Sequence, residues 1–334
     1  MDRQSAAYEA ALMHYVQGET METIARRLMV SRSTVSRLIK SAREKGLVQI
    51  TLHPPEESSS NLGVWISQYF KVKAHVVPVP FKSNEERRLN AVAQMAGTLI
   101  SDLMEPNTII GVAWGNTVAA IANHLSPRPA AGSVVVQLNG AANPSTTGIP
   151  YAGSIMEAFG RAHGSTVQHF SVPAFFDYAE TREALWRERS IAAVRDLQMR
   201  ADVAVFGVGS LTGQNVSLVY SGGYLSPEEL MEIEEDGVVG DVCTVLFRED
   251  GSWRDLEINS RASGPTPDEL VKIPRRLCVV SGVDKIIATL AALRAGVVTD
   301  LIIDENSAAR LRDVALRQAS KMQYKTVNSG KKQS

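Results

Sequence analysis

The chain has 334 residues, with 35 basic and 36 acidic side chains and a formal net charge of −1. A hydrophobic content of 44% and a charged content of 21% are ordinary for a globular protein of about two domains. No apolar run approaches the roughly 20 residues of a membrane helix, and the N-terminus lacks the apolar core of a signal peptide. These features exclude a membrane-spanning chain, and we expect a cytoplasmic protein with no membrane partner.

Cysteine and histidine usage indicates neither a metal site nor a disulfide framework. The two cysteines, Cys243 and Cys278, are far apart in the sequence and form no C-x-x-C pair. The six histidines show no metal-ligand spacing. We therefore predict reduced thiols in the core, no metal and no other cofactor.

The first 45 residues predict three helices. Residues 5–17 form a first helix that ends at Gly18, and residues 20–45 are typical of a helix-turn-helix. Ser31 is a suitable N-cap for the second helix of this motif, in which apolar residues recur at i, i+3, i+4 and i+7. The predicted packing positions of the two helices are Ile24, Ala25, Leu28, Val35, Leu38, Ile39 and Ala42.

The outward face of that second helix carries the groups that a helix needs in the major groove of DNA. Hydroxyl and guanidinium groups near its N-terminus suit base edges, and cations further along suit phosphates. Between Thr23 and Lys45, basic residues occur at positions 26, 27, 32, 37, 40, 43 and 45, against a single acid at 44. Such local charge is typical of nucleic-acid binding; the alternative is a helical hairpin with a solvated basic face. The predicted DNA-binding residues are Ser31, Arg32, Ser33, Thr34, Ser36, Arg37 and Lys40.

A composition change marks the end of the first domain. After Gly46, a C′ glycine that closes the second helix, residues 47–52 alternate apolar and polar positions as in a strand. This strand predicts a winged variant of the motif; alternatively, it begins the next domain. We divide the chain into a helix-turn-helix domain (1–53), a linker (54–61), an effector-binding domain (62–322) and a disordered tail (323–334).

From residue 61 onward, apolar strands alternate with helices. This pattern predicts an α/β domain with a doubly wound, mostly parallel sheet covered on both faces, interrupted by an irregular middle after residue 207. The expected strands span 74–78, 108–113, 133–138, 167–172, 203–207, 277–281 and 300–304. The expected helices span 62–70, 85–104, 117–125, 154–163, 180–199, 284–294 and 307–321.

The loops that follow the strands are candidate ligand-binding segments, because open parallel sheets bind ligands beyond the carboxyl ends of their strands. One glycine-rich loop alone is more often plain turn chemistry, but four loops with amide, hydroxyl and lysine side chains suit a small polyhydroxylated anion such as a sugar phosphate. Neither G-x-G-x-x-G nor G-x-x-x-x-G-K-[ST] occurs. The predicted effector-binding residues are Trp114, Gly115, Asn116, Thr117, Asn139, Gly140, Gly209, Ser210, Asp241, Arg261 and Lys285.

The three charged residues of this set have alternative interpretations. Asp241 either hydrogen-bonds sugar hydroxyls or caps a local turn. Arg261 either holds a phosphate bidentately or pairs with Glu257 or Asp255 at the surface. Lys285 is expected to contact ligand, because a cation at a helix start is otherwise electrostatically unfavourable.

Short motifs along the chain carry a family resemblance. They include S-T-V-S-R-L at 33–38, G-V-A-W-G-N-T at 111–117 and S-G-V-D-K at 281–285. Further motifs occupy residues 46–50, 136–140, 172–174, 206–210, 237–241 and 301–305. With these motifs in this order, the chain resembles the SorC/DeoR-type sugar-binding bacterial transcriptional regulators from about residue 8 to 320.

The resemblance implies a helix-turn-helix and an effector domain similar to the sugar-phosphate isomerase and CoA-transferase fold. It also implies dimers or tetramers that release or rearrange on operator DNA when a phosphorylated sugar or polyol binds. Some members carry a Schiff-base lysine where this chain has Asn139, so we expect noncovalent binding. Some place a phosphate-binding arginine where this chain has Ala174, so either the phosphate is held differently or the effector is unphosphorylated.

We therefore predict a sequence-specific DNA-binding regulator of carbohydrate or polyol metabolism, and not an enzyme. Its partners would be double-stranded operator DNA, a small sugar or sugar phosphate, and further copies of itself in a dimer or homotetramer. One alternative is a sugar-phosphate isomerase-like enzyme with an appended helix-turn-helix domain, in which Asp241, Asp304 or Glu305 is the general base. Another is a DNA-binding structural protein that is insensitive to ligands.

Overall fold

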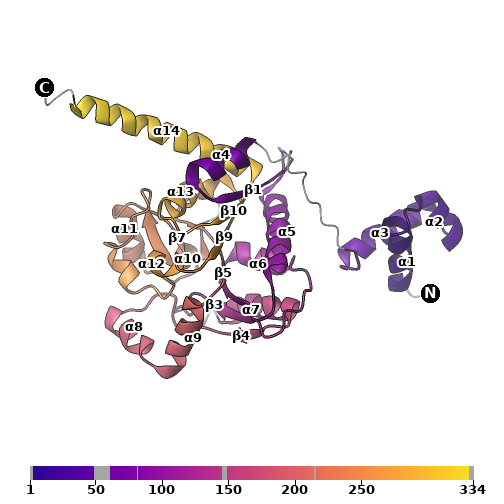
Figure 1. Cartoon of the computed structure of the whole chain (residues 1–334), viewed down its shortest axis with the longest axis horizontal. Helices are drawn as coiled ribbons and strands as arrows, with labels where there is room; N and C mark the ends of the chain where they lie inside the picture. The colour runs from indigo at the N-terminus through magenta and orange to yellow at the C-terminus, as the bar shows by residue number, and fades with distance from the viewer. Residues whose placement is uncertain (1–2, 49–60, 81, 145–148, 214–215, 331–334) are drawn as a thin grey trace. The chain divides into compact units, whose positions relative to one another are not determined.

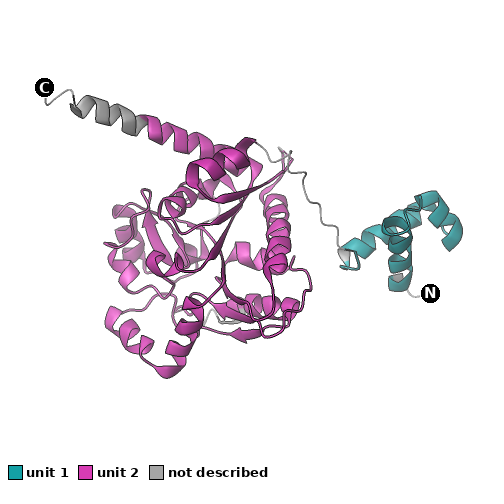
Figure 2. Ribbon diagram, in the orientation of Figure 1, with its two compact units in different colours: residues 1–55 teal, residues 56–334 magenta. Residues whose placement is uncertain are grey.

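The computed structural model describes residues 3–48, 61–80, 82–144, 149–213 and 216–330. The chain separates into two compact units, residues 1–55 and residues 56–334 (Figure 2). The division falls close to the boundary expected at residue 53. The expected linker, and most of the strand expected at 47–52, lie outside the described residues.

The first unit contains three helices, α1 (Arg3–Tyr15), α2 (Met21–Leu28) and α3 (Arg32–Glu44). Their apolar faces form one small core in which Ile24, Val35 and Ile39 are buried, as the helical periodicity predicts. Local chemistry sets the helix ends. The side chains of Thr20 and Ser31 cap α2 and α3, Met29 ends α2 with a left-handed φ of 53°, and Gly46 follows α3 with a φ of 68°.

The second unit is built on a seven-stranded sheet in the order β1-β10-β9-β5-β2-β3-β4, and every pair of neighbours is parallel (Figure 1). Its strands are short apolar runs because both faces are covered. Along β5, for example, Val203 and Val205 belong to one core cluster, while Ala204 and Phe206 belong to the other. The strands are β1 (Lys73–Val77), β2 (Ile109–Val112), β3 (Val134–Gln137), β4 (Thr166–Gln168), β5 (Val203–Gly207), β9 (Arg275–Val280) and β10 (Asp300–Asp304).

Helices cover both faces of this sheet, as the sequence predicts. Residues of α5 (Glu85–Leu103), α6 (Asn116–Ala122) and α7 (Ile149–His163) pack in one core cluster. Residues of α4 (Asn61–Phe70), α13 (Ile286–Arg294) and α14 (Glu305–Gly330) pack in the other. Among the described residues, no helix combines the length and apolar character needed to cross a membrane.

The strand order reverses beside β2. From β2 the chain passes through α6 to β3 on one side, whereas β5 pairs with the opposite edge of β2. The loops after β2 and β5 therefore lead away from each other. In an open parallel sheet, such a point leaves a crevice at the carboxyl ends of the strands.

The segment expected to be irregular contains a second, antiparallel sheet in the order β6-β7-β8. Its strands were not predicted from the sequence; one has only two residues, and another contains Gly240. They are β6 (Gly209–Ser210), β7 (Val238–Val242) and β8 (Val245–Arg248). The short helices of this segment are α10 (Leu218–Ser221), α11 (Pro227–Glu235), the 3-10 helix η2 (Glu257–Ser260) and α12 (Pro267–Leu270). The 3-10 helix η3 (Val283–Lys285) follows β9, at the start of the helix expected at 284–294.

The helix expected at 154–163 begins earlier, at Ile149, and the strand expected at 167–172 ends at Gln168. Two further helix predictions differ more from the structure. The helix expected at 180–199 is two helices, α8 (Ala179–Trp186) and α9 (Arg189–Met199), which are separated by an extended Glu188. The last helix continues beyond the expected end at residue 321 to Gly330, so the tail expected to be disordered from 323 is helical through its described part. No glycine or proline occurs between 321 and 329 to end the helix earlier.

Candidate functional site

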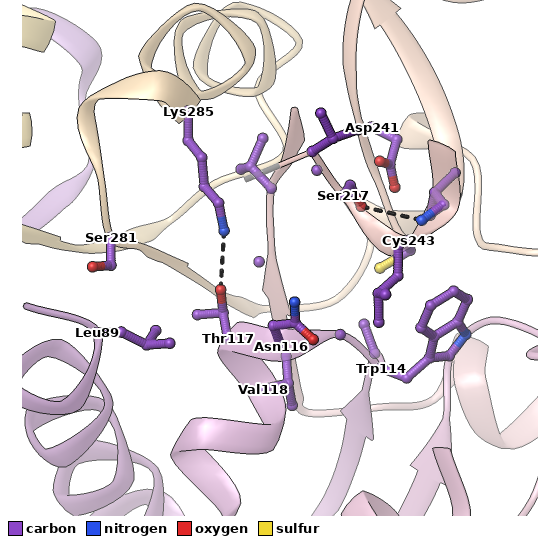
Figure 3. Close-up of a pocket in the computed structure, with 18 of the residues that line it drawn as sticks. Leu89, Trp114, Asn116, Thr117, Val118, Ser217, Asp241, Cys243, Ser281 and Lys285 are labelled. Atoms are coloured by element: carbon purple, nitrogen blue, oxygen red, sulfur yellow. Dashed lines mark hydrogen bonds between the residues drawn. The ribbon is translucent and has the colours of Figure 1, made fainter. Parts of the chain in front are cut away.

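A cavity of about 510 Å³ lies in the crevice at the carboxyl ends of β2, β3, β5 and β9 (Figure 3). Its walls come from the start of α5, the loop between β2 and α6, and residues 207–209 and 216–219. The turn between β7 and β8 and the loop after β9 complete it. The cavity therefore combines segments that are far apart in the sequence.

The structure brings most of the predicted effector-binding residues together in this cavity. Those that line it are Trp114, Gly115, Asn116, Thr117, Asn139, Gly209, Asp241 and Lys285. Gly140, Ser210 and Arg261 are not among its lining residues.

These three residues have structural partners instead. The Gly140 carbonyl accepts a hydrogen bond from Trp114 Nε1 at 2.7 Å, and Ser210 Oγ donates to the carbonyls of Thr212 and Asp284. Arg261 forms an ion pair with Glu229 at 2.5 Å, and not with Glu257 or Asp255. The guanidinium of Arg261 is therefore held at the second sheet by a carboxylate from α11.

The loop after β2 is held rigidly by aromatic contacts. The Trp114 ring stacks on Tyr224 with centroids 5.1 Å apart, and the Tyr151 hydroxyl donates to Asn116 Oδ1 at 3.1 Å. Gly115 has a φ of 144°, which side-chain-bearing residues rarely adopt. The glycine thus allows the chain to turn from β2 directly into α6 at the cavity wall.

Lys285 extends into the cavity, and its Nζ donates to Thr117 Oγ1 at 3.2 Å (Figure 3). Burial lowers the pKa of Lys285, while the nearby carboxylates of Glu85 and Asp241 act in the opposite direction. The lysine links the loop after β9 to the start of α6 across the cavity. A ligand that enters here must either contact this ammonium group or displace it from Thr117.

Asp241 is buried on β7, on the wall formed by the second sheet. Its Oδ2 accepts the Thr244 N–H at 3.1 Å. Burial raises the pKa of this carboxyl to about 6, against the opposing effects of the Thr244 amide, the Tyr220 hydroxyl and Lys285. A Cβ at position 209 would lie 1.8 Å from Asp241 Oδ1, so glycine at 209 makes room for the carboxylate.

The turn between β7 and β8 is strained. Its two central residues, Cys243 and Thr244, have left-handed φ values of 51° and 70°, in a two-residue hairpin that normally requires Asn or Gly. Positive φ is especially costly for a β-branched residue. Both residues line the cavity, and neither is the Asn or Gly that would have identified this turn from the sequence.

Three buried polar atoms of cavity residues make no hydrogen bond of good geometry within the described residues. They are Asn139 Oδ1, Asp241 Oδ1 and Ser281 Oγ. An unpaired buried polar atom costs free energy, and such atoms are rare in folded proteins. All three atoms belong to residues that line the same cavity. In the same part of the chain, no group of three or more His, Cys, Asp or Glu side chains is arranged to hold a metal ion.

The outer face of α3 in the first unit presents the predicted DNA-binding residues to solvent. All of them are exposed except Thr34, which is half-buried. Ser31 Oγ accepts the Thr34 N–H at 3.2 Å and lies 2.8 Å from both Ser33 Oγ and Thr34 Oγ1. Hydroxyl groups therefore cluster at the start of the helix, and Arg37 and Lys40 follow them.

Residues 55–312 match the Sugar-bind family, a sugar-binding domain. The chain belongs to this family. A solved domain of a possible sugar-binding transcriptional regulator from Arthrobacter aurescens TC1 is 48% identical. It superposes with a TM-score of 0.72 and covers 78% of this chain and 99% of that one.

Two further relatives span nearly the whole chain. The deoxyribonucleoside regulator of Bacillus subtilis (strain 168) is 29% identical over 313 residues, which cover 93% of this chain and 98% of the relative. The full-length sorbitol operon regulator SorC from Klebsiella pneumoniae shares the fold, with 22% identity, a TM-score of 0.73 and coverage of 93% and 99%. These similarities confirm the predicted resemblance to SorC/DeoR-type regulators.

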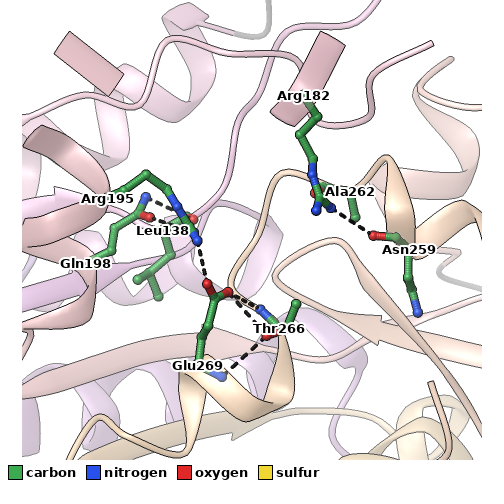
Figure 4. Close-up of polar contacts among 8 residues, drawn as sticks. All are labelled: Leu138, Arg182, Arg195, Gln198, Asn259, Ala262, Thr266 and Glu269. Atoms are coloured by element: carbon green, nitrogen blue, oxygen red, sulfur yellow. Dashed lines mark hydrogen bonds and ion pairs between the residues drawn. The ribbon is translucent and has the colours of Figure 1, made fainter. Parts of the chain in front are cut away.

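Within this sugar-binding domain, a cluster of polar contacts joins α9 to Leu138 and to α12 (Figure 4). Gln198 Nε2 donates to the carbonyl of Gln137 at 2.8 Å, and Gln137 Nε2 donates to the carbonyl of Asn139 at 2.7 Å. Arg195 pairs with Glu269 at 2.5 Å. The Gln198 contact joins α9 to the end of β3, the Gln137 contact reaches the backbone of Asn139, and the Arg195–Glu269 pair joins α9 to α12.

Proposed function

We propose that this protein is a sequence-specific DNA-binding transcriptional regulator of carbohydrate or polyol metabolism, controlled by a small sugar that binds in the cavity. One observation that carries the proposal is a cavity in a sugar-binding domain whose lining residues include polar atoms without a hydrogen-bond partner. The other is that the same chain contains a three-helix unit with an exposed basic face. The regulatory names of relatives that match about nine-tenths of the chain support it.

On the DNA side, α2 and α3 form the proposed helix-turn-helix, and α3 is the recognition helix. Ser31, Ser33, Ser36 and Arg37 would contact base edges and nearby phosphates, together with Arg32, Thr34 and Lys40. Paired recognition helices must match half-sites a helical turn or a multiple apart. A dimer or tetramer of the chain would provide that spacing, and a wing from residues 47–52 would add a contact.

On the effector side, we propose noncovalent binding by the polar lining of the cavity. This domain would belong with the sugar-phosphate isomerase and CoA-transferase folds. The effector would bind one arrangement of the subunits more tightly and shift the population toward it. Gly140 and Ser210 would act by holding the walls, while Arg261 would stay with Glu229.

Geometry gives little support to the enzyme alternative. Asp304 is fully buried, and its carboxylate accepts hydrogen bonds from the Gly282 N–H, the Ser307 N–H and the Ser307 hydroxyl. It is therefore committed to the fold and cannot act freely as a general base. Glu305 does not line the cavity. Of the three residues proposed as a general base, Asp241 is therefore the one that lies in the described lining.

A paired binding experiment tests the proposal. Fluorescence anisotropy would measure binding of the full chain to its own promoter fragment and to random duplex at physiological salt, with and without sugars and sugar phosphates. Thermal shift would measure the melting temperature of the protein with each of these ligands, because binding to the folded state raises it by mass action. The proposal predicts promoter preference that a stabilising ligand changes. Equal affinity for both duplexes under all conditions would contradict it, and turnover of a ligand would favour the enzyme.

A further inference from the structure

The charge of the cavity lining is unusual for a site that would hold a phosphorylated sugar. Among the described lining residues, Glu85, Glu86 and Asp241 are acids and Lys285 is the one base. Between residues 61 and 320, the residues outside the description are 81, 145–148 and 214–215, and none of them has a charged side chain. Arg88, close in sequence to the two glutamates, donates instead to the Ser83 carbonyl. The lining thus presents more negative than positive charge.

The single ammonium group of the lining already has partners. Lys285 Nζ donates to Thr117 Oγ1, and its positive charge is favoured by Glu85 and Asp241. A Cβ on Gly282, three residues before this lysine, would lie 3.8 Å from Glu85 Oε1, so the Glu85 carboxylate reaches the same loop. A dianionic phosphate at Lys285 would therefore lie in the field of these carboxylates.

The polar side-chain atoms of lining residues that lack a partner of good geometry are also mostly acceptors, although the Tyr220 hydroxyl lies close to Asp241. Asn139 Oδ1 accepts only, and Asp241 Oδ1 accepts when the carboxyl is ionised. Ser281 Oγ can accept or donate. Sugar and polyol hydroxyls can donate to all three atoms. A phosphate monoester near neutral pH offers three strong acceptor oxygens and carries close to two negative charges, so it would place acceptors against acceptors.

We propose that this cavity selects an uncharged sugar or polyol and discriminates against its phosphate monoester. The inference rests on the proposed effector-binding function and names the ligand class of that site. Hydroxyl groups of the ligand donate to Asn139 and Asp241, and a ligand oxygen accepts from Lys285. The carboxylates of Glu85 and Glu86 at the mouth repel anions. The proposed ligand is therefore an unphosphorylated sugar or polyol, and not the sugar phosphate that the sequence suggested.

Matched ligand pairs test this inference on the full chain. Isothermal titration calorimetry and thermal shift would compare erythritol, sorbitol and 2-deoxyribose with erythritol 4-phosphate, sorbitol 6-phosphate and 2-deoxyribose 5-phosphate. Inorganic phosphate would serve as a competitor. For the parent that binds most tightly, we expect its phosphate ester to bind at least about tenfold more weakly, because like charges brought together reduce affinity. Inorganic phosphate should not displace the parent.

A charge-removal variant tests the cause of the selectivity. Glu85→Gln with Glu86→Gln should narrow the affinity ratio between parent and ester by at least about threefold, mainly by tightening the ester. The matched control is Glu228→Gln with Glu232→Gln, which removes the same charge from exposed positions on α11 that do not line the cavity. The control should leave the affinity ratio unchanged. This result would show that the ratio depends on repulsion by the two glutamates at the cavity and not on the net charge of the protein.

The possible results separate the ligand selectivity of the cavity from the proposed function. Tighter binding of a phosphate ester than of its parent, or displacement of the parent by inorganic phosphate, overturns the inference and leaves the proposed regulator intact. An equal change of ratio in both double variants overturns the role of the two glutamates at the cavity mouth. Absence of any response across the panel, with no effect on promoter binding, contradicts the proposed function and this inference with it.

Discussion

The three-helix unit and the cavity hold their functional groups in opposite ways. In the unit, the proposed DNA-contacting side chains follow one another on a single helix and lie mostly in solvent. In the cavity, the polar groups come from segments spread between residues 84 and 285, and several are buried. Water screens the first set, so each side chain acts nearly alone, whereas burial couples the second set. Substitutions should therefore have small, separable effects in the unit and large, coupled effects around the cavity.

The largest effect is expected for Gly140→Ala. The added Cβ would lie 2.3 Å from the Pro173 carbonyl oxygen and 2.4 Å from that of Val172. Both contacts are backbone atoms, which cannot move aside as a flexible side chain can. We expect the second unit to lose about 3 kcal/mol or more of unfolding free energy, measured by urea denaturation of the full chain.

The matched control for this variant is Gly153→Ala. A Cβ there would lie 3.9 Å from the nearest side-chain atom, that of His169, within α7. Alanine is also a better helix former than glycine by about 1 kcal/mol. The control should be neutral or stabilising. If the two variants are equally stable, close packing of the cavity loop against residues 172–173 is not what fixes Asn139.

A pH effect of nearly the same size is expected at Asp241. Burial raises its folded-state pKa from 3.8 to about 6, so the folded protein binds this proton more tightly than the unfolded chain. The destabilisation from burying the charge is therefore absent below about pH 4 and fully present above about pH 6. Near neutral pH, Asp241→Asn should be more stable than the natural protein by roughly 1–3 kcal/mol.

Urea denaturation of both proteins across the acidic range provides the measurement. The stability advantage of Asp241→Asn should shrink to nothing as the pH falls to about 4. The groups that face this carboxyl are Tyr220, Thr244, Cys243 and Lys285. An advantage that stays constant with pH would show that the effect comes from packing and not from the buried charge.

Some parts of the site could be predicted from the sequence because they depend on local signals. Strand ends could be located because apolar runs end sharply, and residues such as Trp114 and Lys285 follow those ends directly. The three helices of the first unit were predicted because periodicity and the Ser31 cap are local signals. Fold class followed from the same alternation of strands and helices.

The remainder depended on contacts between distant segments. Glu85 and Glu86 reach the cavity because β1 lies at the sheet edge and α5 crosses back toward β2, an order that no local pattern records. The left-handed Cys243–Thr244 turn lacks the Asn or Gly that normally identifies it. Arg261 was assigned to the ligand because its partner, Glu229, lies on a helix within the segment expected to be irregular.

A ligand-specific loss is expected for Lys285→Ala. Removing the ammonium group takes away a charged hydrogen-bond donor, so affinity for the tightest-binding polyol should fall by about 1.5–3 kcal/mol, measured by calorimetry. DNA affinity without ligand should not change, because the lysine lies in the other unit. Lys272→Ala, at an exposed position outside the cavity, is the control. Full ligand response in Lys285→Ala would remove this lysine from the proposed site.

The reciprocal loss is expected for Arg37→Ala. If this exposed guanidinium contacts a base, operator affinity should fall by about 1–3 kcal/mol, while calorimetric affinity for the polyol is retained. Arg200→Ala, which removes an exposed arginine paired with Asp196 in the second unit, should bind DNA normally. An Arg37→Ala protein that binds the promoter at full strength would show that Arg37 is a solvent-exposed side chain that makes no contact with DNA.

The smallest effect separates the two roles of Ser31, which caps α3 and is also a proposed DNA contact. Ser31→Ala should destabilise the first unit by about 1 kcal/mol through loss of the cap, seen as faster amide hydrogen exchange in α3. Ser31→Asp preserves the cap and adds a charge that helix N-termini favour, so exchange should stay slow. Its carboxylate would repel phosphate, however, and operator affinity should still fall. If Ser31→Asp binds operator as well as the natural protein does, the start of α3 does not approach the DNA backbone, and the recognition surface must lie further along the helix.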